Sequence, residues 1–193
     1  EGIHVGLTVI AAMPSYLNKQ VIHQYYYSIA EVIKRLIAQE NLEIYIFCQV
    51  IGPTEDEDDR KAVAEVIRLL GEPNPKRVIP IYEEHTPEEL KACYGLMDCF
   101  IASRLHSGIF SFSMETPTLF IGYLHKTLGV LKALDMAKFV IDIKDLSTSN
   151  LWNKTTDMIS NRNTIVPEIK AQMRHITDKL DGLPNELIEV TIE

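Results

Sequence analysis

The sequence lacks the features that define several broad classes of protein. It has no excess of basic residues, because its formal net charge is −8, whereas binding to nucleic acid or to an anionic membrane through charge needs basic patches. It has three cysteines, none in a C-x-x-C pair and none spaced as in a zinc site. No apolar run approaches the roughly 18 residues of a membrane span, and no signal-peptide pattern is present. We therefore expect no nucleic-acid partner and no transmembrane segment.

The composition that remains is that of a folded α/β domain. Of the 193 residues, 46% are hydrophobic and 24% are charged, which is enough apolar material for one ordinary core. Cys48, Cys93 and Cys99 lie in apolar or helical surroundings and predict buried thiols in a reducing cytosol. The chain opens directly on a strand-like run without an initiator methionine, so we expect it to be part of a longer protein.

Hydrophobic periodicity predicts an alternation of strands and helices. The expected strands are 3–10, 42–50, 77–82, 98–103, 117–123 and 138–143. The expected helices are 20–39, 58–71, 86–97, 106–115, 126–134, 148–161 and 164–181, of which 86–97 opens with Thr86 as N-cap and Pro87 at the first helical position. This order predicts one doubly wound, mostly parallel, Rossmann-like domain over 1–193.

A group of cations is expected at one edge of that sheet. Arg104 and His106 fall on the loop between an expected strand and helix, and Lys126 follows the next strand, so all three lie at the carboxyl ends of strands, where open parallel sheets bind ligands. The backbone N–H groups of Ser107 and Gly108 should be exposed at the start of that helix. Arginine, lysine and a helix start favour a bound anion, and histidine can move a proton near neutral pH.

Ordinary structural roles compete with each of these interpretations. Arg104 could pair with Asp98 or Glu115, His106 could be a hydrogen-bonded core residue, and Lys126 could be a solvated side chain. The acidic run at 55–59 could hold a divalent metal, but a solvated first turn of a helix is the more common meaning of such a run. Tyr25 and Tyr26 lie on the apolar face of their helix, which favours packing over stacking on a sugar.

One block of the sequence resembles a known family. Residues 97–136 contain an aspartate that opens a strand, R-x-H, a small-residue helix, a proline-led strand, and an aromatic residue shortly before a lysine. This block is similar to the most characteristic part of the polysaccharide pyruvyl transferase family. The layout of residues 1–140 also resembles that family, but the specific similarity is confined to 97–126.

The resemblance implies a fold, a reaction and a set of roles. The chain would be the C-terminal lobe of a two-lobed protein like the GT-B glycosyltransferases, with its N-terminal lobe missing. The family moves a pyruvyl group from phosphoenolpyruvate to two hydroxyls of a cell-surface polysaccharide sugar, forms a cyclic ketal and releases phosphate. Arg104, Lys126 and the Ser107 and Gly108 amides would bind the donor, and His106 would be the general acid and base. No metal or cofactor is implied.

The same resemblance implies where the protein works and with what. The acceptor would be a saccharide or a lipid-linked oligosaccharide, and the protein would be cytoplasmic or peripheral to the membrane where such sugars are assembled. An isolated lobe would bind the donor weakly and would not catalyse the reaction, because both lobes are needed to enclose and orient the substrates.

The sequence departs from the family at two places and leaves other functions open. A cation is often found after the first strand of this lobe; here Lys19 could substitute. Glu115 precedes Thr116-Pro117 where G-x-P is usual; it could orient a ligand hydroxyl, but we favour the simpler role of ending its helix. Glu115, Tyr123 and His125 are therefore weaker site candidates. One alternative is a GT-B glycosyltransferase that uses a nucleotide sugar, which would need a ribose-binding carboxylate such as Glu115. Another is a non-catalytic domain that binds a sugar or a protein partner.

Overall fold

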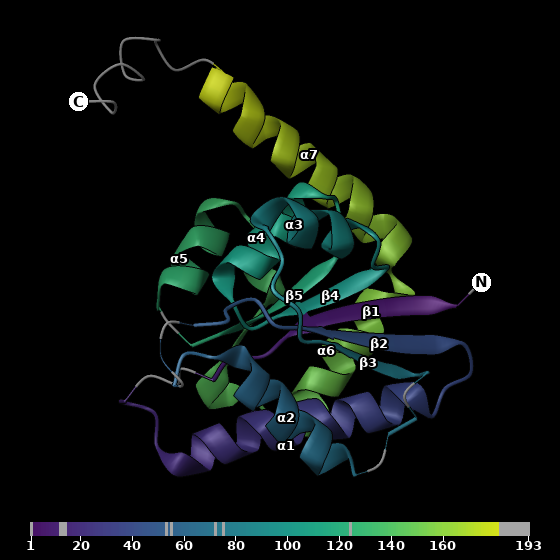
Figure 1. Cartoon of the computed structure of the whole chain (residues 1–193). Helices are drawn as coiled ribbons and strands as arrows, with labels where there is room; N and C mark the ends of the chain where they lie inside the picture. Colours follow the sequence, from purple (N-terminus) through teal and green to yellow (C-terminus); the bar gives the residue numbers. More distant parts are fainter. Residues whose placement is uncertain are drawn as a thin grey trace.

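The computed structural model (Figure 1) describes residues 2–11, 15–52, 54, 56–71, 73–74, 76–123 and 125–181. Of the side chains within these ranges, those at 125, 126, 180 and 181 lie outside the description. The structure therefore covers both expected sheet halves and the R-x-H segment between them.

A six-stranded parallel sheet forms the centre of the molecule. Its strands are β1 (Ile3–Thr8), β2 (Leu42–Phe47), β3 (Val78–Ile81), β4 (Cys99–Ala102), β5 (Thr118–Gly122) and β6 (Val140–Asp142). They lie in the order β3-β2-β1-β4-β5-β6, and every neighbouring pair is parallel. This is the strand order of a Rossmann-like doubly wound sheet, so the expected fold class is confirmed.

Helices cover both faces of this sheet (Figure 1). They are α1 (Lys19–Ile37), α2 (Asp59–Leu70), α3 (Pro87–Gly95), α4 (Leu105–Ser113), α5 (His125–Ala133), α6 (Thr148–Ser160) and α7 (Arg162–Asp181), with short 3₁₀ helices η1 (Ala137–Phe139) and η2 (Ile143–Asp145). Helices α1, α2 and α6 lie on one face, and α3, α4 and α7 lie on the other. The capping box of Thr86 and Glu89 at the start of α3 is present as expected.

The core is continuous across the sheet because the central strands are apolar along their whole length. Every residue of β4 and β5 is buried, as expected for parallel strands covered on both faces. Cys48 and Cys99 are buried free thiols, as expected, whereas the free thiol Cys93 is only half-buried. Burial raises the pKa of both Cys48 and Cys99 to about 12.

Two strands end earlier than the hydrophobic runs predict. The first run continues to Ile10, but the Ile10 amide donates to the Tyr25 hydroxyl and its carbonyl accepts from Tyr26. The second continues to Val50, whose amide donates to the Asp59 carboxylate and whose carbonyl accepts from the Asp59 amide. These backbone groups leave the sheet ladder, so the loops at the carboxyl edge begin while the chain is still apolar.

Candidate functional site at the carboxyl ends of β1 and β4

β1 and β4 are neighbours at the centre of the sheet, and the order of successive strands changes direction between them. The chain leaves β1 toward β2 on one side, and it leaves β4 toward β5 on the other. The loops at the carboxyl ends of these two strands therefore separate, and this is where open α/β sheets bind ligands. The last residue of β1 is Thr8, and Ser103 and Arg104 connect β4 to α4.

Buried hydroxyl groups fix the start of α4 across this switch point. The Thr8 and Ser107 hydroxyl oxygens lie 2.8 Å apart, and Thr8 Oγ1 also accepts from the Ser103 amide at 3.2 Å. Ser107 Oγ donates to the Arg104 carbonyl at 2.7 Å. Thr8, Ser103 and Ser107 are all buried. Because buried polar groups are costly unless hydrogen-bonded, this set of bonds favours one position for the loop that carries Arg104.

Tyr25 joins the same set from helix α1. Its hydroxyl donates to Ser103 Oγ at 2.7 Å and accepts from the Ile10 amide at 3.1 Å. The side chain is fully buried, and this burial raises the pKa of Tyr25 above that of a free tyrosine. Tyr25 thus packs in the core, as its position on the apolar helix face predicts, and it also ties α1 to both central loops.

Arg104 forms a two-point ion pair with Asp59 at the start of α2. Arg104 Nη2 lies 2.6 Å from Asp59 Oδ1, and Arg104 Nε lies 3.1 Å from Asp59 Oδ2. The Asp59 side chain is 0% exposed and that of Arg104 is 17% exposed. Burial alone would lower the pKa of Arg104, but the hydrogen-bonded carboxylate outweighs it and the pKa is raised.

This ion pair corrects two expectations. The partner of Arg104 is neither Asp98 nor Glu115 but Asp59, which is 45 residues away in the sequence. The acidic run was expected to be a solvated helix start, and that is right for Asp58, the partly exposed N-cap of α2, which accepts from the Arg60 amide. It is wrong for Asp59, which is buried because its carboxylate receives hydrogen bonds from three different loops.

The alternative of a metal site at the acidic run finds no support in the described chain. Within the residues that the structure places, no cluster of three or more His, Cys, Asp or Glu side chains is arranged to hold a metal ion. Asp59 has both oxygens committed to N–H donors, and Asp58 caps α2 and pairs with Arg60.

His106 lies in the first turn of α4 and is exposed at the carboxyl edge. The N-cap position of this helix is Arg104, whose side chain makes no capping hydrogen bond. The N–H groups of the first helical turn have no partner inside a helix, and among the residues that the structure describes the His106 and Ser107 amides have no backbone partner outside it. The expected contribution of the Gly108 amide is wrong, because it donates to the Arg104 carbonyl at 3.2 Å.

The other rim candidates are placed only in part. The backbone of His125 and Lys126 opens α5 after β5, at the expected edge, but both side chains lie outside the described part of the chain. Tyr123 is half-buried at the same edge; burial raises its pKa, and the nearby Arg104 charge acts in the opposite direction. Its carbonyl accepts from the Tyr16 hydroxyl. Lys19 is exposed in the first turn of α1, at the carboxyl edge.

Glu115 lies at the opposite edge of the sheet. It follows α4 and precedes β5, so it belongs to the amino ends of the strands. Its carboxylate binds Lys170 of α7, with Nζ 2.9 Å from Oε1. As a ligand-orienting residue at the rim, Glu115 is therefore ruled out by the topology of the chain. Its backbone has a φ of 62°, in the left-handed region that glycine adopts without steric cost.

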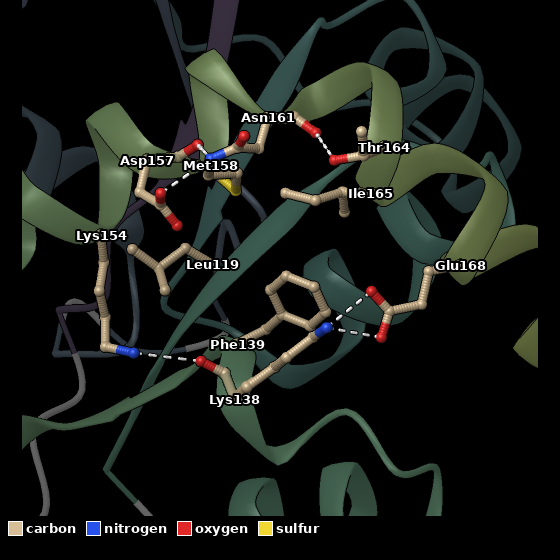
Figure 2. Close-up of a pocket in the computed structure, with 10 residues that line it drawn as sticks. All are labelled: Leu119, Lys138, Phe139, Lys154, Asp157, Met158, Asn161, Thr164, Ile165 and Glu168. Atoms are coloured by element: carbon tan, nitrogen blue, oxygen red, sulfur yellow. Dashed lines mark hydrogen bonds and ion pairs between the residues drawn. The ribbon is translucent and has the colours of Figure 1, made fainter.

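A cavity of about 480 Å³ also lies toward the amino ends of β5 and β6, between α6 and α7 (Figure 2). Its floor is apolar and its rim is polar. The rim groups bind one another: Lys138 pairs with Glu168, Lys154 donates to the Lys138 carbonyl, and Asn161 donates to Asp157. The cavity thus lies at the edge of the sheet opposite to Arg104 and His106. Because most of its described polar side chains bind one another, it offers few unpaired polar groups to a ligand.

The fold and the switch-point residues define a Rossmann-like domain with an arginine, a histidine and a helix start at its ligand-binding edge. A profile of the polysaccharide pyruvyl transferase family matches residues 14–125, which is more than half of the chain. The chain belongs to this family. The matched range includes Asp59, Arg104 and His106, and it ends immediately before Lys126.

Individual proteins resemble this chain over different shares of its length. The amylovoran biosynthesis protein AmsJ of Erwinia amylovora is 28% identical over 112 residues, which cover 58% of this chain and 26% of that protein. The chain thus spans about a quarter of that relative's length. Two solved structures of trehalose-6-phosphate synthase are similar, with TM-scores of 0.46 and 0.47 at 9% and 6% identity. The two alignments cover 95% and 94% of this chain, and 44% and 46% of the respective synthase chains.

Among the residues that the structure describes, no helix is both long enough and apolar enough to cross a bilayer.

Proposed function

We propose that this domain binds phosphoenolpyruvate at the switch point between β1 and β4 and takes part in transferring its pyruvyl group to a saccharide. The observation that carries the proposal is the position of His106: it is exposed in the first turn of α4, two residues after an arginine that is held at the same edge. Family membership over residues 14–125 supplies the reaction class.

The donor has two anionic groups, and the site offers matching hydrogen-bond donors. Arginine has five N–H groups, and the ion pair with Asp59 uses its Nε and Nη2 groups. In the described part of the chain, Arg104 Nη1 has no hydrogen-bond partner, so two donors remain for a carboxylate or phosphate. The free amides at the start of α4 favour the same charge. Lys126 at the start of α5 would add a cation from the next loop.

The reaction needs a group that exchanges protons near neutral pH. One saccharide hydroxyl oxygen attacks C2 of phosphoenolpyruvate while the CH₂ carbon takes a proton and becomes CH₃. The second hydroxyl oxygen then bonds to C2, and the C–O bond to phosphate breaks. The two hydroxyl protons end on the methyl carbon and on phosphate, so the atoms balance. We assign His106 to these proton transfers, which are typically worth about 10² to 10⁴ in rate.

The structure weakens the main alternative, a site for a nucleotide sugar. That function would need a carboxylate near the rim to bind ribose, and the candidate for it, Glu115, lies at the other edge of the sheet with Lys170.

We further propose that this domain is one lobe of a two-lobed protein. It would form the side of the site that binds the donor, and the other lobe would hold the saccharide. The domain alone would then bind donor without releasing phosphate, and steady phosphate release with an acceptor sugar would contradict this part.

Isothermal titration calorimetry tests the proposed donor. Phosphoenolpyruvate and a nucleotide diphosphate sugar are titrated separately into the parent protein, Arg104→Ala and the control Arg60→Ala, whose arginine is exposed and pairs with Asp58. We expect phosphoenolpyruvate to bind the parent and Arg60→Ala equally, and Arg104→Ala about 10- to 100-fold more weakly, as for loss of a charged hydrogen bond. Binding of the nucleotide sugar alone, or no binding of either, would overturn the proposal.

A further inference from the structure

The Asp59 carboxylate has no hydrogen-bonding capacity left for a ligand. Oδ1 accepts from Arg104 Nη2 at 2.6 Å and from the Ala11 amide at 3.3 Å. Oδ2 accepts from Arg104 Nε at 3.1 Å and from the Val50 amide at 3.0 Å. A carboxylate offers about four lone-pair sites, and these four bonds fill them. Asp59 therefore neither contacts substrate nor accepts a proton during the reaction.

The same four bonds connect three loops at the carboxyl edge. Ala11 follows β1, Val50 follows β2, and Arg104 follows β4, so one side chain at the start of α2 fixes both sides of the switch point. The loop after β2 is fixed twice, because the Asp59 amide also donates to the Val50 carbonyl at 2.9 Å. With its side chain 0% exposed, this carboxylate is little screened by water, so its hold on Arg104 is strong.

The ion pair also determines which part of Arg104 can face a ligand. Asp59 takes the edge of the guanidinium formed by Nε and Nη2, and the Glu57 carbonyl lies 3.5 Å from Nη2. Nη1 points away from this edge because the guanidinium is planar. The pair is electrically neutral overall, so Arg104 recognises an anion by directed hydrogen bonds more than by net charge.

We propose that Asp59 is a positioning residue for the donor site: it holds Arg104 so that its Nη1 edge is presented to the anionic groups of phosphoenolpyruvate. This inference rests on the proposed function for the identity of the ligand. The positioning itself rests on the four hydrogen bonds and the complete burial of the Asp59 carboxylate. Asp59→Asn would keep the size of the side chain, but it would place an NH₂ group against N–H donors and leave the guanidinium without a fixed partner.

The experiment compares the parent protein with Asp59→Asn and the control Asp58→Asn by two measurements. Calorimetry gives the dissociation constant for phosphoenolpyruvate, and ¹H–¹⁵N NMR follows the exchange of the Arg104 Nε–H proton. Asp58 is the adjacent carboxylate and the N-cap of α2; asparagine caps helices equally well, so Asp58→Asn should match the parent in both. Asp59→Asn should bind about 10- to 100-fold more weakly, as when a supporting hydrogen bond is lost, and its Nε–H proton should lose protection.

The two measurements separate failure of this inference from failure of the proposed function. If the parent does not bind phosphoenolpyruvate, the proposed function fails, and the Nε–H exchange in Asp59→Asn still decides whether Asp59 holds Arg104. Unchanged affinity or unchanged Nε–H protection in a folded Asp59→Asn protein would overturn the inference. If that variant does not fold, Asp59→Glu replaces it, since it keeps the charge but moves the carboxylate; parent-like affinity there would overturn the inference equally.

Discussion

Gly108 of α4 lies directly against the ring of Phe120 of β5. A Cβ atom built on Gly108 would be 1.9 Å from Phe120 Cε1 and 2.4 Å from Cζ, far inside ordinary contact distance. The close approach lets the helix that carries His106 pack closely on the sheet, over β4 and β5. The absence of a side chain at Gly108 is therefore a condition for the position of the candidate site.

Substituting this glycine should destabilise the fold. For Gly108→Ala we expect a loss of about 1–3 kcal/mol in the free energy of unfolding, because the added methyl forces the helix or the Phe120 ring to move. Urea denaturation followed by circular dichroism measures it. Gly129→Ala is the control, since Gly129 is also in a helix but, apart from its chain neighbours and its own helix backbone, no described atom lies within 4 Å of its Cβ position; alanine there should be neutral or stabilising by up to about 1 kcal/mol. Equal effects at both positions would contradict the packing account.

The hydroxyl of Ser107 should contribute more to stability than a similar hydroxyl in the same helix. Ser107→Ala removes the buried contact with Thr8 Oγ1 and the partly buried bond to the Arg104 carbonyl, so we expect a loss of about 1–3 kcal/mol. In Ser113→Ala a half-buried hydroxyl loses its single bond to the Phe110 carbonyl, and the loss should stay below about 1 kcal/mol. Thermal denaturation of both variants tests this difference, and a larger loss at Ser113 would count against it.

Replacing Glu115 should relieve backbone strain at the turn before β5. Its φ of 62° lies in the left-handed region, which costs a residue with a side chain roughly 1–2 kcal/mol. Glu115→Gly removes this cost but also breaks the exposed pair with Lys170, which is worth about 0–1 kcal/mol. We expect a net stabilisation of about 0.5–1 kcal/mol from chemical denaturation. Lys170→Ala, which loses the pair and keeps the strain, should be neutral or slightly destabilised; a destabilised Glu115→Gly would contradict the account.

Stability should fall as the pH rises above about 9 because of buried thiols. Burial raises the pKa of Cys99 from 9.0 to about 12. Between these values the unfolded thiol loses its proton while the folded one keeps it, so the unfolded state binds fewer protons and the free energy of unfolding decreases with pH. The slope from Cys99 should be about 1 kcal/mol per pH unit between about pH 9 and 10. Cys99→Ala should show a correspondingly shallower slope in urea denaturation, and an identical slope in both proteins would rule this out.

The sequence was sufficient to predict the strands and helices but not the contacts at the switch point. Parallel strands buried on both faces read as continuous apolar runs, and each of the expected strands lies within three residues of its observed ends. The runs extended too far at Ile10 and Val50, because local hydrophobicity cannot show that a backbone group will bond to Tyr25 or Asp59 instead of the next strand.

Asp59 was missed for a related reason. An aspartate in the first turn of a helix is usually solvated and complements the helix dipole, and nothing in the run 55–59 separates it from its acidic neighbours. Its burial depends on Arg104, which is distant in sequence and reaches it only once β4 lies beside β1. Glu115 was misplaced because its closeness in sequence to His106 hides that α4 carries the chain to the opposite edge.

The central claim is that His106 and Arg104 form one binding site for phosphoenolpyruvate. The most direct measurement is ¹H–¹⁵N NMR of the histidine rings during a titration with phosphoenolpyruvate, with His106 assigned from His106→Gln. His4 is the internal control, because it lies near the amino end of β1, at the other edge of the sheet. The account predicts a saturable shift of the His106 ring signals, no shift of His4, and loss of the His106 response in Arg104→Ala. A His106 ring that stays unshifted at saturating phosphoenolpyruvate, or that shifts equally in Arg104→Ala, would contradict it.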